Sequence, residues 1–110
     1  LFTKKLSNLL KSKGVTVNCL HPGFVSTSIG SQNQSIVGNF LFNIARPFAR
    51  TIDKGAETSI YLCSSPEVSK ISGEYFFDCK IKETSEGAKN ESDADKLWEI
   101  SSKMTGLSYP

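Results

Sequence analysis

Seven residues, from His21 to Thr27, carry most of the groups in this sequence that could support chemistry. They follow the apolar run Val15–Leu20 and read His-Pro-Gly-Phe-Val-Ser-Thr. Gly23 has no β-carbon, so the backbone there can approach a flat ring or a phosphate closely, and Pro22 stiffens the entry. Thr27 offers a hydroxyl together with its own backbone N–H. This composition favours a ligand-binding loop.

The histidine and the aromatic residue of this loop have plainer explanations. His21 has no second histidine or paired cysteine nearby, so we interpret it as a loop residue packed against the end of a sheet. Phe24 either contacts the substrate or packs its ring into the hydrophobic core. Cys19, Cys63 and Cys79 lie far apart without Cys-x-x-Cys spacing, which predicts neither a zinc site nor a disulfide framework. We therefore expect no bound metal, and a reducing compartment.

The overall composition argues against two classes of partner. The 110 residues include 13 Lys and Arg against 11 Asp and Glu, a net charge of +2, and the basic residues are scattered, so nucleic-acid binding is not expected. No apolar run approaches the roughly 20 residues that a membrane-spanning helix needs. The opening residues, Leu1–Lys5, are neither an initiator methionine nor a signal peptide, so we expect the chain to begin within an element.

The first part of the chain predicts the elements that must position the loop. Apolar residues recur at helical spacing from Phe2 to Lys13, and Gly14 follows where a left-handed cap is needed. The run Val15–Leu20 predicts a buried strand. Residues His21 to Gln34 show no sustained period, which predicts a long loop.

Two further helices are expected in the middle of the chain. The first carries a broad apolar stripe from Ile36 to Phe48, and Pro47 should kink it or end it near Arg46. This stripe is either helix packing or a lid over an apolar substrate. The second helix should begin with Asp53 as its N-cap and run through Cys63, with Ser64-Ser65-Pro66 ending it.

The last part predicts a strand, a linker and a helix. From Gly73 to Ile81 the side chains alternate, which predicts one strand with a drier face. That face would carry Tyr75, Phe77, Cys79 and Ile81. Residues 82–91 read as a surface linker, and Ser92 should open a final helix that Gly106 closes. Strands alternating with helices indicate an α/β fold with a parallel sheet, and two strands are too few to complete one.

Four segments in this order resemble the short-chain dehydrogenase/reductase family, and its retinol dehydrogenase-like subgroup in particular. They are the strand and loop Gly14–Thr27, the stretch Lys54–Tyr61 with its Gly-Ala-x-Thr pattern, Ser72–Cys79 with the pattern Ser-Gly-x-Tyr-Phe-x-Asp-Cys, and the tail Ala94–Trp98. The resemblance covers nearly the whole chain. It implies that residues 1–110 are the C-terminal portion of one Rossmann-type domain with a doubly wound parallel sheet, an incomplete domain.

The resemblance also implies roles for individual residues. Pro22, Gly23, Val25 and Thr27 would bind the nicotinamide end of NADP, or of NAD, the backbone near Val25 and the side chain of Thr27 holding the carboxamide. Phe24, Ile29 and Phe40 would line the pocket for an apolar alcohol or aldehyde such as a retinoid. The family's location would be cytoplasmic or at the cytosolic face of the endoplasmic reticulum, with any membrane attachment through residues preceding this chain.

The family's catalytic residues have no counterpart in this sequence. None of Tyr61, Tyr75 and Tyr109 has a lysine four residues later, and no Gly-x-x-x-Gly-x-Gly phosphate loop occurs. We therefore predict an enzyme by family whose 110 residues are inactive alone. Two alternatives remain open: a non-catalytic product that associates, for example as a homodimer through Tyr75–Ile81, and a dehydrogenase for steroids or small carbonyls.

Overall fold

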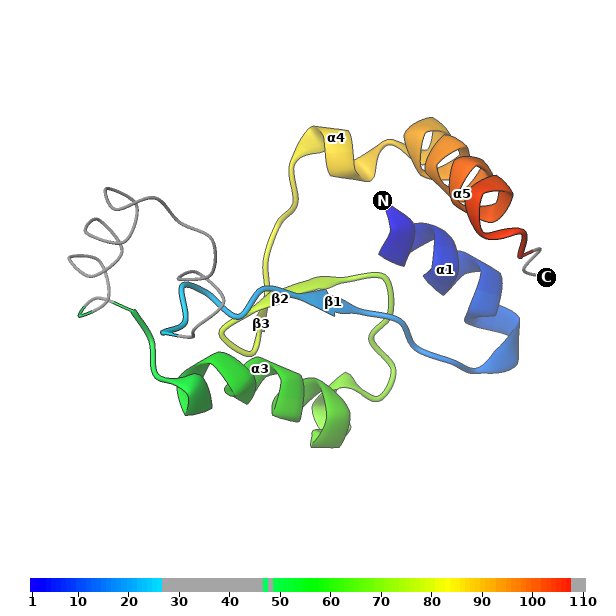
Figure 1. The fold of residues 1–110 in the computed structure, drawn as a ribbon. Coiled ribbons are helices and arrows are strands. Elements are labelled where there is room, and N and C mark those ends of the chain that lie inside the picture. The colour runs from blue at the N-terminus through cyan, green and yellow to red at the C-terminus, as the bar shows by residue number, and fades with distance from the viewer. Residues whose placement is uncertain (27–46, 48, 108–110) are drawn as a thin grey trace, which may run out of the picture.

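Three short strands form the centre of the structure, a computed structural model that describes residues 1–26, 47 and 49–107 (Figure 1). They are β1 (Cys19–Leu20), β2 (Tyr75–Phe77) and β3 (Lys80–Ile81), in the spatial order β1-β2-β3. β1 pairs with β2 in parallel and β2 pairs with β3 in antiparallel fashion. The α/β class is confirmed, but the described sheet is mixed rather than purely parallel.

The prediction of one strand from Gly73 to Ile81 is wrong, because the chain reverses at Asp78 and Cys79. Their φ angles are 52° and 58°, and positive values at both central residues are typical of the type I′ turn of a two-residue hairpin. The expected drier face is also wrong. Phe76 is 1% exposed, whereas Tyr75 and Phe77 on the other face are only half-buried.

The strand predicted over Val15–Leu20 is shorter and less buried than expected. Val17 is nevertheless anchored to the segment before β2: its N–H donates to Ser72 Oγ at 2.9 Å and its carbonyl accepts from Gly73 N at 2.7 Å. Val15 is 48% exposed. Within the described residues β1 lies at the edge of the sheet and pairs only with β2, so no second neighbour buries it.

The first helix follows the prediction closely. α1 (Phe2–Leu10) continues into a 3₁₀ turn, Lys11–Lys13, and Gly14 ends it with a φ of 67°. This left-handed conformation is the one that glycine adopts without a steric penalty.

The two later helices begin at different residues from those predicted. α3 (Ile52–Ser64) is capped by Thr51, whose side chain accepts from Lys54 N, and Asp53 lies in its first turn. α4 (Glu86–Lys89) is a single turn within the predicted linker, and α5 (Glu91–Thr105) is capped by Asn90 rather than Ser92. Gly106 closes α5 as predicted, with a φ of 68°.

The helices lie on two sides of the sheet (Figure 1). α3 runs below it in this view, and α1 and α5 lie side by side toward the upper right. The contact between α1 and α5 includes the rings of Phe2 and Trp98, whose centroids are 4.9 Å apart. Within the described residues, none of the helices is both long and apolar enough to cross a membrane. The helix predicted over 36–48 lies almost entirely outside the described residues.

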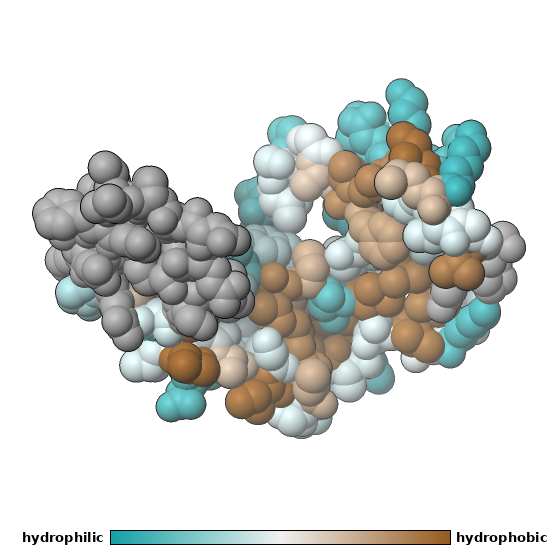
Figure 2. Space-filling view, in the orientation of Figure 1, coloured by the Kyte–Doolittle hydropathy of each residue, from teal (hydrophilic) through white to brown (hydrophobic). Residues whose placement is uncertain are grey.

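Little apolar surface is enclosed by the described chain. The buried apolar residues there are Val68, Phe76 and Ala94. Many apolar side chains of the helices remain on the surface, and Figure 2 shows brown apolar residues beside teal polar ones over α5. The most exposed of them is Met104, at 83%.

Candidate functional site at the strand tips

The predicted ligand-binding loop leaves β1 at its carboxyl end. Because β2 runs parallel to β1, the carboxyl end of β2 lies at the same edge of the sheet. His21 N–H donates to the carbonyl of Phe76 at 3.1 Å, which ties the start of the loop to β2. The ring of His21 lies 6.0 Å from that of Phe77, so this histidine packs against the sheet end as expected. In open α/β sheets this edge is where ligands bind.

Gly23 gives the loop its bend. Its φ is 83°, a left-handed conformation that a side chain would strain, and its N–H donates to Nδ1 of His21 at 2.9 Å. Pro22 and Phe24 on either side are exposed. The bend therefore presents a proline and an aromatic ring toward the surface, with a residue lacking a β-carbon between them.

A backbone bridge joins the loop to the segment that leads into α3. Arg50 N–H donates to the carbonyl of Phe24 at 2.8 Å, and Ser26 N–H donates to the carbonyl of Arg50 at 3.0 Å. Val25 and Arg50 are thereby paired as in a parallel sheet. Both backbone groups of Arg50 are used in this bridge, so the N–H and C=O of Val25 project to the opposite side, away from Arg50.

The side chain of Val25 packs against a glycine in the second turn of α3. A β-carbon placed on Gly55 would lie 2.6 Å from Cγ2 of Val25, too close for any side chain. Glycine in a helix interior weakens the helix by roughly 0.5–1 kcal/mol relative to alanine. Here it allows the loop to lie directly on the helix.

Arg50 also holds the hairpin turn through its side chain. The guanidinium makes a two-pronged ion pair with the carboxylate of Asp78, in which Nη2 lies 2.9 Å from Oδ2. It also lies over the ring of Phe77, 4.7 Å from the centroid. The hydrogen bond to Arg50 lowers the pKa of Asp78, and the same bond raises the pKa of Arg50. We call Gly23, Val25, Arg50, Gly55 and Asp78 the strand-tip clasp.

Three members of the clasp were not predicted as site residues. Asp78 falls inside the stretch predicted as one strand, and Gly55 appears only within a family pattern. Arg50 has no local signal, because its partners are 27 residues before it and 28 residues after it. A glycine inside a helical pattern is a signal of close approach that could have pointed to Gly55.

Thr58 supports the clasp from α3. It is 3% exposed, and its Oγ1 accepts from Cys79 N at 3.2 Å, which fixes the second residue of the hairpin turn. Together with Arg50, it anchors both residues of a turn that contains no glycine.

Three predicted site residues, Thr27, Ile29 and Phe40, lie outside the described residues. Of the others, Pro22, Gly23, Phe24 and Val25 lie together at the strand tips. Cys19, Cys63 and Cys79 are free thiols. Residues 1–26, 47 and 49–107 contain no cluster of three His, Cys, Asp or Glu side chains that could hold a metal ion.

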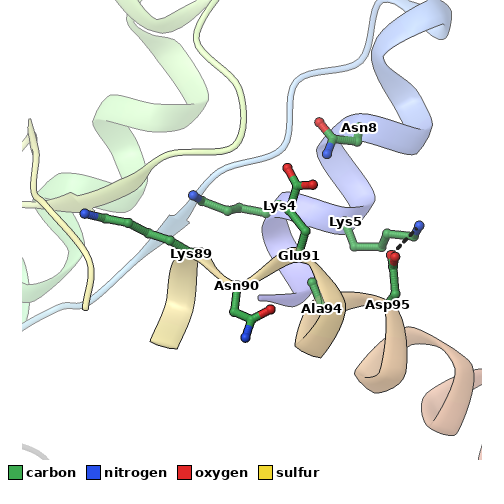
Figure 3. Close-up of a pocket in the computed structure, with 8 residues that line it drawn as sticks. All are labelled: Lys4, Lys5, Asn8, Lys89, Asn90, Glu91, Ala94 and Asp95. Atoms are coloured by element: carbon green, nitrogen blue, oxygen red, sulfur yellow. Dashed lines mark ion pairs between the residues drawn. The ribbon is translucent and has the colours of Figure 1, made fainter. Parts of the chain in front are cut away.

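A separate hollow of about 210 Å³ lies between α1 and the start of α5 (Figure 3). Side chains from α1 and from the α4–α5 region meet across it, and their charges are largely compensated. Lys5 pairs with Asp95 at 2.7 Å, and Lys89 pairs with Glu83 and Glu86 at 2.9 and 2.8 Å. This hollow is therefore a polar gap between helices.

Several retinol dehydrogenases are similar to this chain over nearly its whole length. Retinol dehydrogenase 14 of Homo sapiens is 49% identical over 109 residues, which cover 97% of this chain and 32% of that protein. Retinol dehydrogenase 13 of Homo sapiens is 35% identical over all of this chain and 34% of its own length. The WW domain-containing oxidoreductase of Gallus gallus is 36% identical over 94% of this chain and 25% of its own length. No protein-family model matches the chain. The chain thus spans about a third of the length of the retinol dehydrogenases it matches.

Proposed function

This chain belongs to the retinol dehydrogenase group of the short-chain dehydrogenases, and on that premise we propose that its strand-tip loop holds the nicotinamide end of a dinucleotide cofactor. One observation carries the proposal. The loop from Pro22 to Ser26 leaves the carboxyl end of β1 beside the carboxyl end of β2, and it is fixed there by Arg50. This is the edge of an α/β sheet at which a dinucleotide is expected.

The backbone around Val25 fits a carboxamide group. Its N–H and C=O project away from the bridge with Arg50, so they form a donor and an acceptor at adjacent positions. A carboxamide offers the complementary pair, an acceptor oxygen and two donor hydrogens. Gly23 has no β-carbon, and the Arg50 side chain lies directly against it, which supports the backbone beside these groups. In this proposal Thr27 adds a hydroxyl to the same group, in agreement with the resemblance.

The cofactor would supply hydride, and the chain would orient the ring that carries it. We propose NADP as the cofactor, with NAD as the alternative. The substrate would be an apolar alcohol or aldehyde. We propose a retinoid, because similar proteins are named retinol dehydrogenases. The exposure of Phe24 within the loop, 49%, supports a contact with such a substrate, and Ile29 and Phe40 are further proposed pocket residues.

We propose further that these residues act as part of a longer polypeptide. The chain contains no Tyr-x-x-x-Lys, the pair that exchanges the proton in this family by resemblance. It also spans about a third of the length of its relatives. Exposed apolar side chains such as Ile52, at 65%, and Ile60, at 62%, support the same proposal, because unpaired apolar surface is the usual sign of an interface.

A second candidate is association without catalysis through the hairpin edge. β3 is the edge strand of the described sheet and Ile81 is 49% exposed on it. Lys80 and Lys82 flank this residue, and lysine at an edge discourages pairing with another strand. These two lysines make the hairpin edge a poor site for association. Cofactor binding by the loop is therefore the favoured proposal.

The test uses the full-length protein that contains these residues. Titration with NADPH is expected to show binding, and Thr27→Val to weaken it about tenfold, the effect of one lost hydrogen bond. Thr16→Val, exposed before β1, is the matched control and should leave the affinity unchanged. Reduction of retinal compared with a steroid ketone separates the two substrate classes. Absence of NADPH binding by the unaltered protein would contradict the proposal.

A further inference from the structure

Arg50 joins three separate parts of the strand-tip edge. Its backbone bridges to the loop at Phe24 and Ser26, and its guanidinium pairs with Asp78 in the hairpin turn. It immediately precedes Thr51, the residue that caps α3. The loop, the hairpin and the helix are therefore connected through one side chain and its backbone.

The guanidinium also defines the space beside the loop. A β-carbon on Gly23 would lie 2.8 Å from Nε and 2.9 Å from Cδ of Arg50, so the arginine lies directly against the glycine. On another side it lies over the ring of Phe77. With both prongs bound to Asp78, the guanidinium is held in one orientation and Gly23 is supported by it.

The charge of Arg50 is largely neutralised by this arrangement. Asp78 is its direct partner and Glu57 is a weaker one, and both raise its pKa. Lys54 nearby is itself paired with Glu57. A guanidinium engaged in this way is suited to holding the loop in place rather than to binding an anionic ligand with its own prongs.

From these contacts we infer that Arg50 is a positioning residue that sets the conformation of the nicotinamide-binding loop, with Asp78 as the residue that orients it. The inference rests on the proposed function of the loop. Lysine could keep the charge at this position but could not make the two-pronged contact, since an ammonium lacks the planar fork. The fork is therefore the feature that the site requires.

The experiment compares two ligands on the full-length protein that contains these residues. NADPH reaches the loop, whereas adenosine 2′,5′-bisphosphate lacks the nicotinamide end and reports the remainder of the cofactor site. Arg50→Met should weaken the binding of NADPH by about tenfold or more, the scale of a lost charge-assisted contact. Its affinity for adenosine 2′,5′-bisphosphate should stay within about twofold of that of the unaltered protein. Arg50→Lys should recover only part of this loss. Asp78→Asn should have a similar but smaller effect, and combining it with Arg50→Met should add little, because the two residues form one unit.

Lys103→Met is the matched control, since it removes an exposed ion pair with Glu99 on α5, outside the strand-tip clasp. It should leave both affinities unchanged. Unaltered NADPH binding in Arg50→Met would overturn the inference while leaving the proposed function intact. Equal weakening of both ligands would also overturn it, because Arg50 would then support the fold as a whole. Failure of the unaltered protein to bind NADPH would contradict the proposed function itself.

Discussion

The strand-tip clasp and the pair of helices α1 and α5 are built on opposite principles. In the clasp, contacts are directional: a backbone bridge, a two-pronged ion pair and two glycines that admit neighbouring atoms closely. The helix pair is joined by a ring contact between Phe2 and Trp98 and by the ion pair Lys5–Asp95, with apolar residues such as Ile100 and Met104 still exposed.

This difference indicates that the clasp requires closely fixed atomic positions, whereas the helix pair requires only that its apolar faces stay in contact. A loop that holds a flat ring has to be fixed to within a fraction of an ångström, which glycine contacts and paired polar groups achieve. Two amphipathic helices can slide slightly without losing their apolar contact. Substitutions should therefore lower the free energy of unfolding more in the clasp than in the helix pair.

The largest difference in stability is expected between alanine substitutions of Phe76, in the sheet, and Phe2, in the helix pair. Phe76→Ala removes a ring that is 1% exposed at the centre of the sheet below the clasp, and should lower the free energy of unfolding by about 3–5 kcal/mol. Phe2→Ala removes a ring that is 46% exposed, and should cost about 1 kcal/mol, the scale of an aromatic pair. Urea denaturation of the full-length protein measures both. Equal losses would contradict the contrast between the regions.

Gly55→Ala tests the contact between the loop and α3. The added β-carbon would lie 2.6 Å from Cγ2 and 3.1 Å from Cγ1 of Val25, and we expect a loss of about 1–3 kcal/mol from overpacking. Gly87→Ala in α4 is the matched control, because nothing lies within 4 Å of its added carbon. It should be neutral or slightly stabilising. A neutral Gly55→Ala in thermal denaturation would show that Val25 is not held against the helix.

Gly23→Ala separates backbone strain from the contact with Arg50. Gly23 and Gly14 both have positive φ, 83° and 67°, so alanine at either should cost about 1–2 kcal/mol. A β-carbon on Gly14 meets nothing within 4 Å, whereas one on Gly23 meets Arg50. We therefore expect Gly23→Ala to be the more destabilising of the two in chemical denaturation. If the two substitutions cost the same, Arg50 does not press against the bend.

The smallest effect should come from the ion pairs, and pH distinguishes them. Arg50 lowers the pKa of Asp78 below its ordinary value of 3.8, so the pair stabilises the fold above about pH 4. That contribution is lost as pH falls through the lowered pKa of the folded state. The gap in denaturation midpoint between the unaltered protein and Asp78→Asn should thus persist from pH 7 to 5 and close at lower pH.

Asp95→Asn provides the comparison within the helix pair. It removes a surface contact with Lys5, and should change the free energy of unfolding by less than about 1 kcal/mol at neutral pH. A loss larger than that of Asp78→Asn, measured by the same denaturation, would reverse the ranking of the two regions.

Helix ends show how far local signals extend. Gly14 and Gly106 were located correctly, because a left-handed cap is a property of the glycine itself. The N-caps were each misplaced by two residues, since Thr51 and Asn90 compete with Asp53 and Ser92 for the same role. Which polar residue wins depends on how the preceding chain enters the helix, and for α3 that entry is fixed by the bridge at Arg50.

The amino-acid sequence by itself determined the family, the α/β class and the loop Pro22–Val25 at the end of a strand, because glycine, proline and apolar periodicity act over a few residues. Only the tertiary structure decided the hairpin at Asp78 and Cys79 and the role of Arg50. Neither turn residue is a glycine, and their positive φ angles are stabilised by Arg50 and Thr58, 28 and 21 residues away along the chain. Interactions between such distant residues form only when the fold brings them together.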